Sequence, residues 1–280
     1  MSAPSQPLLI IRPPRGWAAL NVPELWHFRD LLLTFAARDL KLRYKQTALG
    51  VTWVVLQPLL AAGVFSLIFG RLAGLPSDGV PYFLFSFVSM LAWNLFNSVL
   101  TRSSACLVGN PHLISKIFFP RLVLPVSTVG AALVDFAVGL VILVILMPLY
   151  GIRPDWQLLL LPLWTVVLLM LALGIGLFTA ALNVSYRDVQ YILPVALNLL
   201  QYLSPVAYST VLIARARPLV QTLYFLNPLA SLLDAFRRCI LGTHSPPAWT
   251  VAYAIFASLA ALWFGAVAFK QMERRFADVI

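Results

Sequence analysis

The chain has 280 residues, of which 61% are hydrophobic and 11% charged, so its polar side chains are too few to cover a soluble globule of this size. We therefore expect an integral membrane protein. The formal net charge of +10 does not indicate nucleic-acid binding, because the cations lie at the ends of apolar runs, where they meet lipid headgroups, and form no basic face on a soluble fold.

Residues 1–21 are expected to form a loose cytoplasmic tail. The tail is rich in proline, which disfavours a helix, and its apolar run from Leu8 to Ile11 is too short for the core of a signal peptide. At its end, Asn21, Pro23 and Glu24 supply an N-cap, a proline in the first turn and an acid near free backbone amides. A helix should begin there.

The next stretch, residues 22–47, has an apolar stripe at steps of three and four residues, formed by Leu25, Phe28, Leu32, Phe35 and Leu42. Its cations occupy other faces. The pattern predicts an amphipathic helix from Val22 to Lys45 that lies along the cytoplasmic surface of the membrane. A plain charged lead-in to the first span is the alternative, since Asp39 interrupts the stripe.

A dense group of cations precedes the first long apolar run. Four lysines and arginines lie between Arg38 and Lys45, and no side chain is charged from Ala48 to Phe69. Cations that flank a first span usually stay in the cytoplasm. The chain should therefore start inside.

Residues 48–270 are expected to form an all-α membrane domain with six spans of about 20 residues each. The spans lie at about 48–69, 81–100, 122–149, 156–182, 189–207 and 249–269. Six crossings return the tail at 271–280 to the cytoplasm. Inside segments then hold 14 lysines and arginines and outside segments 6, which supports this orientation.

The cytoplasmic loop between the second and third spans contains a candidate short helix from Asn110 to Phe119. Asn110 can cap it, Pro111 can open it and Pro120 ends it. One side is apolar, with Leu113, Ile114, Ile117 and Phe118, and the other is polar, with His112, Ser115 and Lys116. Such a helix is well placed to dock against a soluble partner, and a simple surface turn is the alternative.

Asp135 lies near the middle of the third span, where a carboxylate is costly and normally faces protein or water. A proton relay and a structural hydrogen bond are both compatible with this position. The structural bond is favoured, because no other acid or histidine lies at comparable depth.

Small residues recur every four positions in two spans, Ala172, Gly176 and Ala180 in the fourth and Ala257, Ala261 and Gly265 in the sixth. Such rows let helices approach closely, within one chain or between two. The two cysteines, Cys106 and Cys239, should lie on opposite sides of the membrane and form no disulfide.

Polar and aromatic side chains follow one side of the short fifth span, which should face protein or a cavity. They suit either a conduit lining or helix packing. Gln57 and Pro58 offer a matching polar point in the first span. The conduit-lining candidates are Trp53, Gln57, Tyr191, Asn198, Gln201 and Tyr202.

Two apolar pieces between the fifth and sixth spans, Pro218 to Leu226 and Pro228 to Leu241, are each too short to cross as a helix. Asn227 can start the second piece and Gly242 can end it. We expect two short helices that dip in from the outer face. The arginines of this region, at 215, 217, 237 and 238, would meet lipid phosphates or an anionic substrate.

No phosphate-binding loop, HExxH pair or GxSxG elbow occurs, and the three histidines are dispersed. We therefore expect no catalytic residue, no metal site and no cofactor in this chain.

Four segments together resemble the type-2 ABC exporter permeases of polysaccharides, such as the O-antigen and teichoic-acid exporters. They are RYKQTALGVTWVVLQPL from Arg43, NPHLISKIFFPRLVLP from Asn110, NVSYRDVQYILP from Asn183 and FLNPLASLLDAFRR from Phe225. The resemblance runs from about Leu25 to near the end of the chain.

This resemblance implies a homodimer of the permease with two copies of a separate ATPase that binds MgATP, and export of a lipid-linked glycan across the bacterial inner membrane. It makes 22–45 an interface helix, 110–119 a coupling helix and 219–241 gate helices. The implied coupling residues are Asn110, Leu113, Ile114, Lys116, Ile117 and Phe118, beside a cytoplasmic loop with Arg187 and Asp188. The implied outer-gate residues are Asn227, Leu232, Phe236, Arg237 and Arg238.

Two alternatives remain from the sequence. One is an exporter of a small molecule or drug in the same superfamily. The other is a membrane enzyme acting on polyprenyl-linked sugars, which lacks paired carboxylates at a membrane edge.

Overall fold

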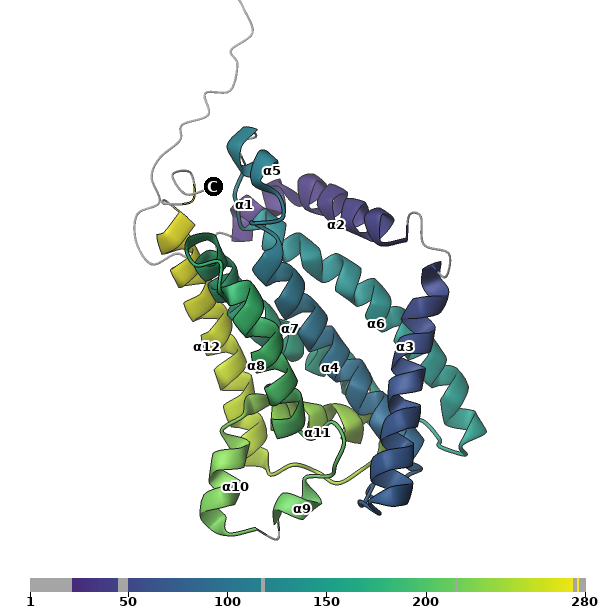
Figure 1. Cartoon of the computed structure of the whole chain (residues 1–280). Helices are drawn as coiled ribbons and strands as arrows, with labels where there is room; N and C mark the ends of the chain where they lie inside the picture. Colours follow the sequence, from purple (N-terminus) through teal and green to yellow (C-terminus); the bar gives the residue numbers. More distant parts are fainter. Residues whose placement is uncertain (1–21, 45–49, 117–118, 215, 274–275, 277–280) are drawn as a thin grey trace, which may run out of the picture.

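The computed structural model describes residues 22–44, 50–116, 119–214, 216–273 and 276 (Figure 1). In this part of the chain the regular structure is helical and no strand occurs, which confirms the all-α prediction. Five helical segments are long and apolar enough to cross a membrane: Val55–Leu72, Tyr82–Ala105, Val123–Leu149, Trp156–Ser185 and Ala248–Met272. They correspond to five of the six predicted spans.

The remaining predicted span, the fifth at 189–207, is shorter as a helix than expected. Helix α8, Val189–Leu203, has 15 residues and ends before Ser204. Pro205 follows, and a residue before a proline is disfavoured in helical conformation. The segment from 204 to 210 is therefore not a regular helix.

The long helices and α8 run side by side as a bundle in Figure 1. They are α3 (Gly50–Phe65, continued by a π-helix, Ser66–Leu72), α4 (Tyr82–Ala105), α6 (Val123–Leu149), α7 (Leu161–Ser185, preceded by a 3-10 turn, Trp156–Leu160), α8 and α12 (Ala248–Met272). Within the described chain 78% of the apolar stretch of α4 is buried, against 11 to 33% for the other four candidate spans. Helix α4 is thus the centre of the bundle.

Short helices gather at the two ends of the bundle (Figure 1). One end carries α1 (Val22–His27), α2 (Arg29–Tyr44) and α5 (Pro111–Lys116), and the other carries α9 (Val211–Ala214), α10 (Pro218–Phe225) and α11 (Pro228–Leu241). The predicted single helix from Val22 is in two pieces that part at Phe28, and its last residue, Lys45, lies outside the described residues.

The apolar stripe of the N-terminal helices packs onto the bundle. Phe35 is buried in a cluster with Phe119 and Phe269, and Leu25, Phe28 and Leu32 pack partly buried against it, whereas Leu42 is 65% exposed. The rings of Phe35 and Phe119 meet edge to face at 5.7 Å. The packed stripe therefore stops before Leu42.

Helix α11 begins and ends where the sequence predicts. The Oδ1 of Asn227 accepts a hydrogen bond from the Leu229 amide at 3.1 Å, and Gly242 takes a left-handed conformation with φ +67°. Its amide donates to the carbonyl of Arg238 at 2.9 Å. Both signals act within one helical turn, so the surrounding fold is not needed to predict them.

The small residues in α7 and α12 bring helices of the same chain together. A Cβ at Gly176 would lie 1.9 Å from the Ser103 hydroxyl of α4, and one at Gly265 would lie 1.9 Å from the Gly174 carbonyl oxygen. These contacts leave no room for a methyl group. They settle the choice left open by the sequence in favour of packing within one chain for these two positions.

We predict that Gly265→Ala lowers the free energy of unfolding by about 1 to 3 kcal/mol, because its methyl group forces α7 and α12 apart. Thermal unfolding of the purified protein in detergent measures the effect. Gly63→Ala is the control, since its Cβ would meet only a Phe83 ring atom at 4.0 Å. Equal melting temperatures for the two variants would contradict the close contact.

Candidate functional site

Helix α11 lies inside the protein at one end of the bundle, packed against α4, α7 and α12. Leu232 and Phe236 are 2% and 1% exposed, and the Phe236 ring lies 5.9 Å from that of Phe136 on α6. Four of the five outer-gate candidates sit on this helix, at 232, 236, 237 and 238. Asn227, the fifth, caps it and also donates from Nδ2 to the Ser204 hydroxyl at 2.9 Å.

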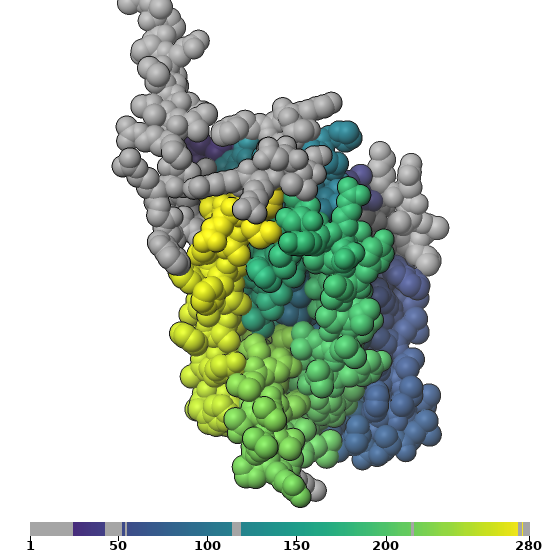
Figure 2. Space-filling model, turned by 60° about the vertical axis from the view of Figure 1, so that its left-hand side comes forward, coloured from purple at the N-terminus to yellow at the C-terminus, as the bar shows by residue number. Residues whose placement is uncertain are grey.

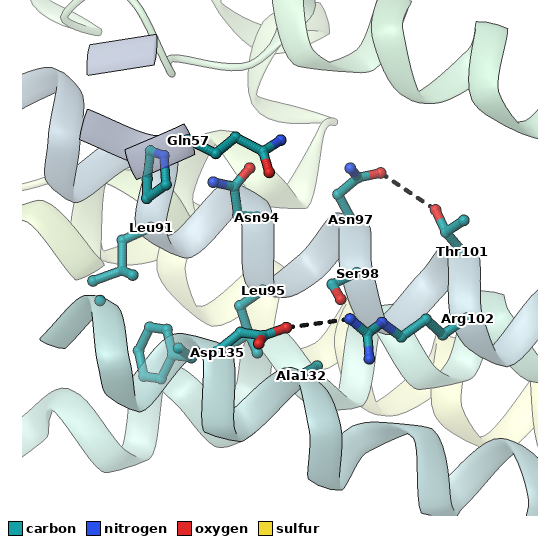
Figure 3. A pocket seen from close by; sticks show the side chains of 13 residues that line it. Gln57, Leu91, Asn94, Leu95, Asn97, Ser98, Thr101, Arg102, Ala132 and Asp135 are labelled. Carbon is teal, nitrogen blue, oxygen red and sulfur yellow. Dashed lines mark hydrogen bonds and ion pairs between the residues drawn. The ribbon is translucent and has the colours of Figure 1, made fainter. Parts of the chain in front are cut away.

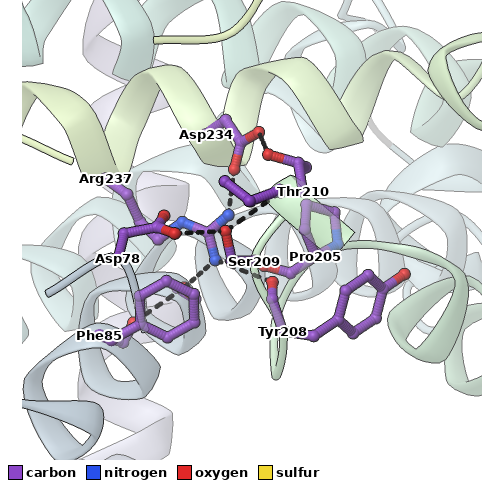
Figure 4. Close-up of polar contacts among 10 residues, drawn as sticks. Asp78, Phe85, Pro205, Tyr208, Ser209, Thr210, Asp234 and Arg237 are labelled. Carbon is purple, nitrogen blue, oxygen red and sulfur yellow. Dashed lines mark hydrogen bonds and ion pairs between the residues drawn. The ribbon is translucent and has the colours of Figure 1, made fainter. Parts of the chain in front are cut away.

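Arg237 is 1% exposed, and its guanidinium is surrounded by acceptors (Figure 4). Nη1 donates to the carbonyl oxygens of Pro205 at 2.7 Å and Tyr208 at 3.3 Å, and to the hydroxyl of Ser89 at 3.2 Å. The ring of Phe85 lies 4.3 Å from the guanidinium carbon. The arginine therefore joins α11 to α4 and to the segment after α8.

A chain of polar contacts continues from this arginine (Figure 4). Nη2 of Arg237 forms an ion pair with Oδ1 of Asp234, whose Oδ2 accepts a hydrogen bond from the Thr210 hydroxyl. The neighbouring Ser209 hydroxyl donates to Oδ1 of Asp78 at 2.6 Å. The loop before α4, the segment after α8 and helix α11 are thus held in one network.

The prediction that Arg237 meets lipid phosphates or substrate is wrong. A buried charge needs a counter-ion and hydrogen-bond acceptors, and this one has both inside the chain. The ion pair could have been predicted from the sequence, because Asp234 and Arg237 are three residues apart and so share a helix face. Of the other arginines of this region, Arg217 is exposed, Arg238 is half-buried, and Arg215 lies outside the described residues.

Asp135 forms an ion pair with Arg102, from Oδ2 to Nη2 at 3.2 Å. Asp135 thus has a partner within the bundle, which agrees with the favoured structural role. The predicted second span ends at about residue 100, so its bounds put Arg102 in the cytoplasmic loop and not beside Asp135. Helix α4 continues to Ala105, so Arg102 lies in its last turn and reaches α6.

The conduit-lining candidates point in different directions. Tyr191 and Tyr202 are 72% and 70% exposed on α8, and Asn198 is exposed as well. In Figure 2, α8 (green) lies on the face turned towards the viewer, beside α12 (yellow). Gln201 is half-buried and donates from Nε2 to the Met90 sulfur of α4 at 3.6 Å.

On α3, Trp53 is 50% exposed and Gln57 is exposed. Helix α4 packs against both α3 and α8. The two sets of candidates thus flank the same central helix.

At the other end of the bundle, Asn110 closes α4, because its Nδ2 donates to the Cys106 carbonyl at 2.8 Å. Leu113 is half-buried against the Phe35 cluster. The side chains of Ile114 and Lys116, and residues Ile117 and Phe118, lie outside the described residues. Arg187 and Asp188 are exposed in the turn between α7 and α8.

Comparison with known proteins decides the family. Residues 30–241 match the ABC-2 type transporter family. The chain belongs to this family. The matched range begins in α2 and ends with the last residue of α11, so it contains the Arg237 network and α5.

Relatives of this ABC-2 chain are similar over most of their length. The O-antigen export system permease protein RfbA of Myxococcus xanthus is 31% identical, over 92% of this chain and 98% of the relative. RfbA of Klebsiella pneumoniae is 27% identical, over 92% and 97%. The polysialic acid transport protein KpsM of Escherichia coli is 24% identical, over 84% and 91%.

We predict that Arg237→Met lowers the stability of this ABC-2 chain by about 3 to 5 kcal/mol, because it leaves Asp234 buried without its counter-ion. Adding Asp234→Leu should restore part of the loss, since both charges are then gone. Thermal unfolding in detergent measures both variants.

Arg238→Met is the matched control, because this neighbouring arginine is half-buried and carries no ion pair within the described chain. If Arg237→Met and Arg238→Met unfolded at the same temperature, the network would not support the fold.

Proposed function

We propose that this chain is the permease subunit of an ATP-driven exporter that moves a lipid-linked polysaccharide across the bacterial inner membrane. The observation that carries the proposal is the near full-length similarity to permeases named for O-antigen export. Similarity to a polysialic acid transport protein points to the same class of substrate.

The chemistry of the substrate explains why a protein is needed. A glycan carries many hydroxyl groups, which have no hydrogen-bond partner in hydrocarbon. Since the sequence contains no phosphate-binding loop, we assign hydrolysis of MgATP to a separate ABC ATPase. Two copies of this chain and two of the ATPase would form the transporter.

We assign six crossings to the chain, with both termini in the cytoplasm. Helix α8, with 15 residues, spans only about 22 Å, which is short of the roughly 30 Å of hydrocarbon. The buried segment from 204 to 210 would complete this crossing. Its irregular backbone is compatible with membrane depth because protein covers it and Arg237 binds two of its carbonyls.

The ends of the bundle then take different roles. Helices α1 and α2 would lie along the cytoplasmic surface, α5 with residues 110–119 would bind the ATPase, and Arg187 and Asp188 would lie on the same side. Helices α10 and α11 would lie at the outer side. The exposed Tyr191, Asn198 and Tyr202, with Trp53 of α3, would line a path between two copies, where aromatic rings pack against sugar rings.

Deletion of the gene tests the function directly. Lipid-linked glycan should accumulate inside the cells and disappear from their surface, and the gene supplied on a plasmid should restore export. Mass analysis of the accumulated lipid-linked glycans would also identify the substrate. Normal surface glycan in the deletion strain would refute the proposal.

We predict that Tyr202→Ala reduces export more than it reduces assembly, because its side chain is 70% exposed and supports no contact on which the bundle depends. Surface glycan and the amount of purified complex are measured in the same cells. Gln201→Leu should also reduce export, but with some loss of folded protein, since Gln201 contacts Met90. Proportional loss of complex and export in Tyr202→Ala would make this face structural.

We also predict that Ile114→Asp and Ile117→Asp each weaken ATPase binding about tenfold or more, because burial of such a side chain contributes roughly 1.5 to 3 kcal/mol. Copurification of the ATPase with normally inserted permease is the measurement. Lys116→Ala, on the polar side of the sequence pattern, should have a much smaller effect. If both aspartate variants still retain the ATPase, the N-terminal helices become the better docking element.

A further inference from the structure

A polar cavity of about 280 Å³ lies between α3, α4 and α6 (Figure 3). Its polar lining includes Gln57 of α3, Asp135 of α6 and, from α4, Asn94, Asn97, Ser98 and Arg102. All three helices belong to candidate membrane spans. The cavity is separate from the Arg237 network and lies within one chain.

The α4 side of the cavity is a polar stripe on one helix face. Positions 94, 97, 98, 101 and 102 repeat at steps of three and four and therefore point the same way. Polar side chains within a span are costly unless they face protein partners, water or a ligand. This stripe faces the cavity.

The hydrogen bonds inside the described chain do not use up the amide groups of this lining. Arg102 pairs with Asp135, and the Thr101 hydroxyl donates to Asn97 Oδ1 at a long 3.4 Å. The amides of Gln57 and Asn94 point towards one another in Figure 3, but neither holds a hydrogen bond to the described chain. Each amide therefore has a donor and an acceptor free for another molecule.

The charged side chains that line the cavity favour a neutral ligand. The positive charge of Arg102 is balanced by Asp135, whose side chain remains 17% exposed. A phosphate would be repelled by that carboxylate, and an apolar group would leave the amides unbonded. Paired amide, hydroxyl and charged groups instead match the alternating donors and acceptors of a sugar ring. The volume of about 280 Å³ is just below the usual range for a drug-sized ligand, which suits a single sugar residue.

We propose that this cavity binds one neutral sugar residue of the exported glycan inside each chain. The proposal rests on the proposed function, since it names a contact for that substrate. Gln57 and Asn94 donate to and accept from the ring hydroxyls. The cavity lies towards the α5 end of α4, which is the cytoplasmic side, so it takes up a sugar before the path between the two copies.

Protection of a cysteine tests the proposal in vesicles that contain the purified permease–ATPase complex. Ser98→Cys changes the lining by one atom and leaves Gln57 and Asn94 in place. A water-soluble maleimide should react with it. The unaltered chain gives the background, because both native thiols, Cys106 and Cys239, are buried, and burial raises the pKa of the Cys106 thiol. The Val144 side chain is 66% exposed on the outer face of α6, which lipid would cover. Val144→Cys should therefore not react with the water-soluble reagent.

Three additives separate the possible occupants. They are the lipid-linked glycan extract of the source cells, the free glycan released from it by mild acid, and the remaining lipid. The extract and the free glycan should slow the reaction about tenfold at about ten times the half-protecting concentration, because roughly one site in eleven is then empty. The remaining lipid should give no protection.

Matched variants identify the binding groups. With Asn94→Leu or Gln57→Leu added, the half-protecting concentration should rise about fivefold to tenfold, whereas Val141→Leu, on the outer face, should leave it unchanged.

The proposal is overturned if Ser98→Cys does not react, if glycan gives no protection and the cavity holds only water, or if the remaining lipid protects as well as the free glycan. The deletion strain is examined in parallel. Lost export together with an unprotected Ser98→Cys rejects this site and keeps the proposed function, whereas intact export rejects both.

Discussion

The buried guanidinium of Arg237 is the interaction on which the α11 end of this protein depends. Helix α8 stops at Leu203, and the irregular segment that follows leaves carbonyl groups inside the protein, where water cannot satisfy them. Arg237 binds two of them, and Asp234 balances its charge. Helix α11 must therefore lie beside this segment. Its position in turn sets where α12, the next helix in the chain, joins the bundle.

The opposite end is held mainly by apolar contacts. The cluster around Phe35 joins α2 to the ends of α4, α7 and α12. Polar contacts add to it. The Arg121 guanidinium donates to the Glu273 carbonyl at 2.6 Å and so ties the start of α6 to the end of α12, and Asn183 Nδ2 donates to the Ser104 carbonyl at 3.1 Å. A protein that binds α5 would thus contact an element that packs on this cluster through Leu113.

Arg237 and Arg102 both lie inside the bundle, but they differ in whether a ligand can reach them. Arg237 is enclosed by acceptors of its own chain and has no access to a ligand. Arg102 pairs with Asp135 and lines an open polar cavity, with a side chain that is 28% exposed. A buried charge that is paired inside the chain supports the fold, whereas a polar group that lines a cavity can contact another molecule.

The sequence by itself determined the membrane class, the positions of the long helices and the ends of α11, because long apolar runs, Asn227 and Gly242 act through composition or within one turn. Only the tertiary structure decided that Arg237 is buried, that Gln201 turns to Met90, and that Arg102 meets Asp135. These partners are 33 to 148 residues apart where the contact joins two helices. Which side chains meet at such separations depends on how helices cross and how far each one continues, and no local pattern records either.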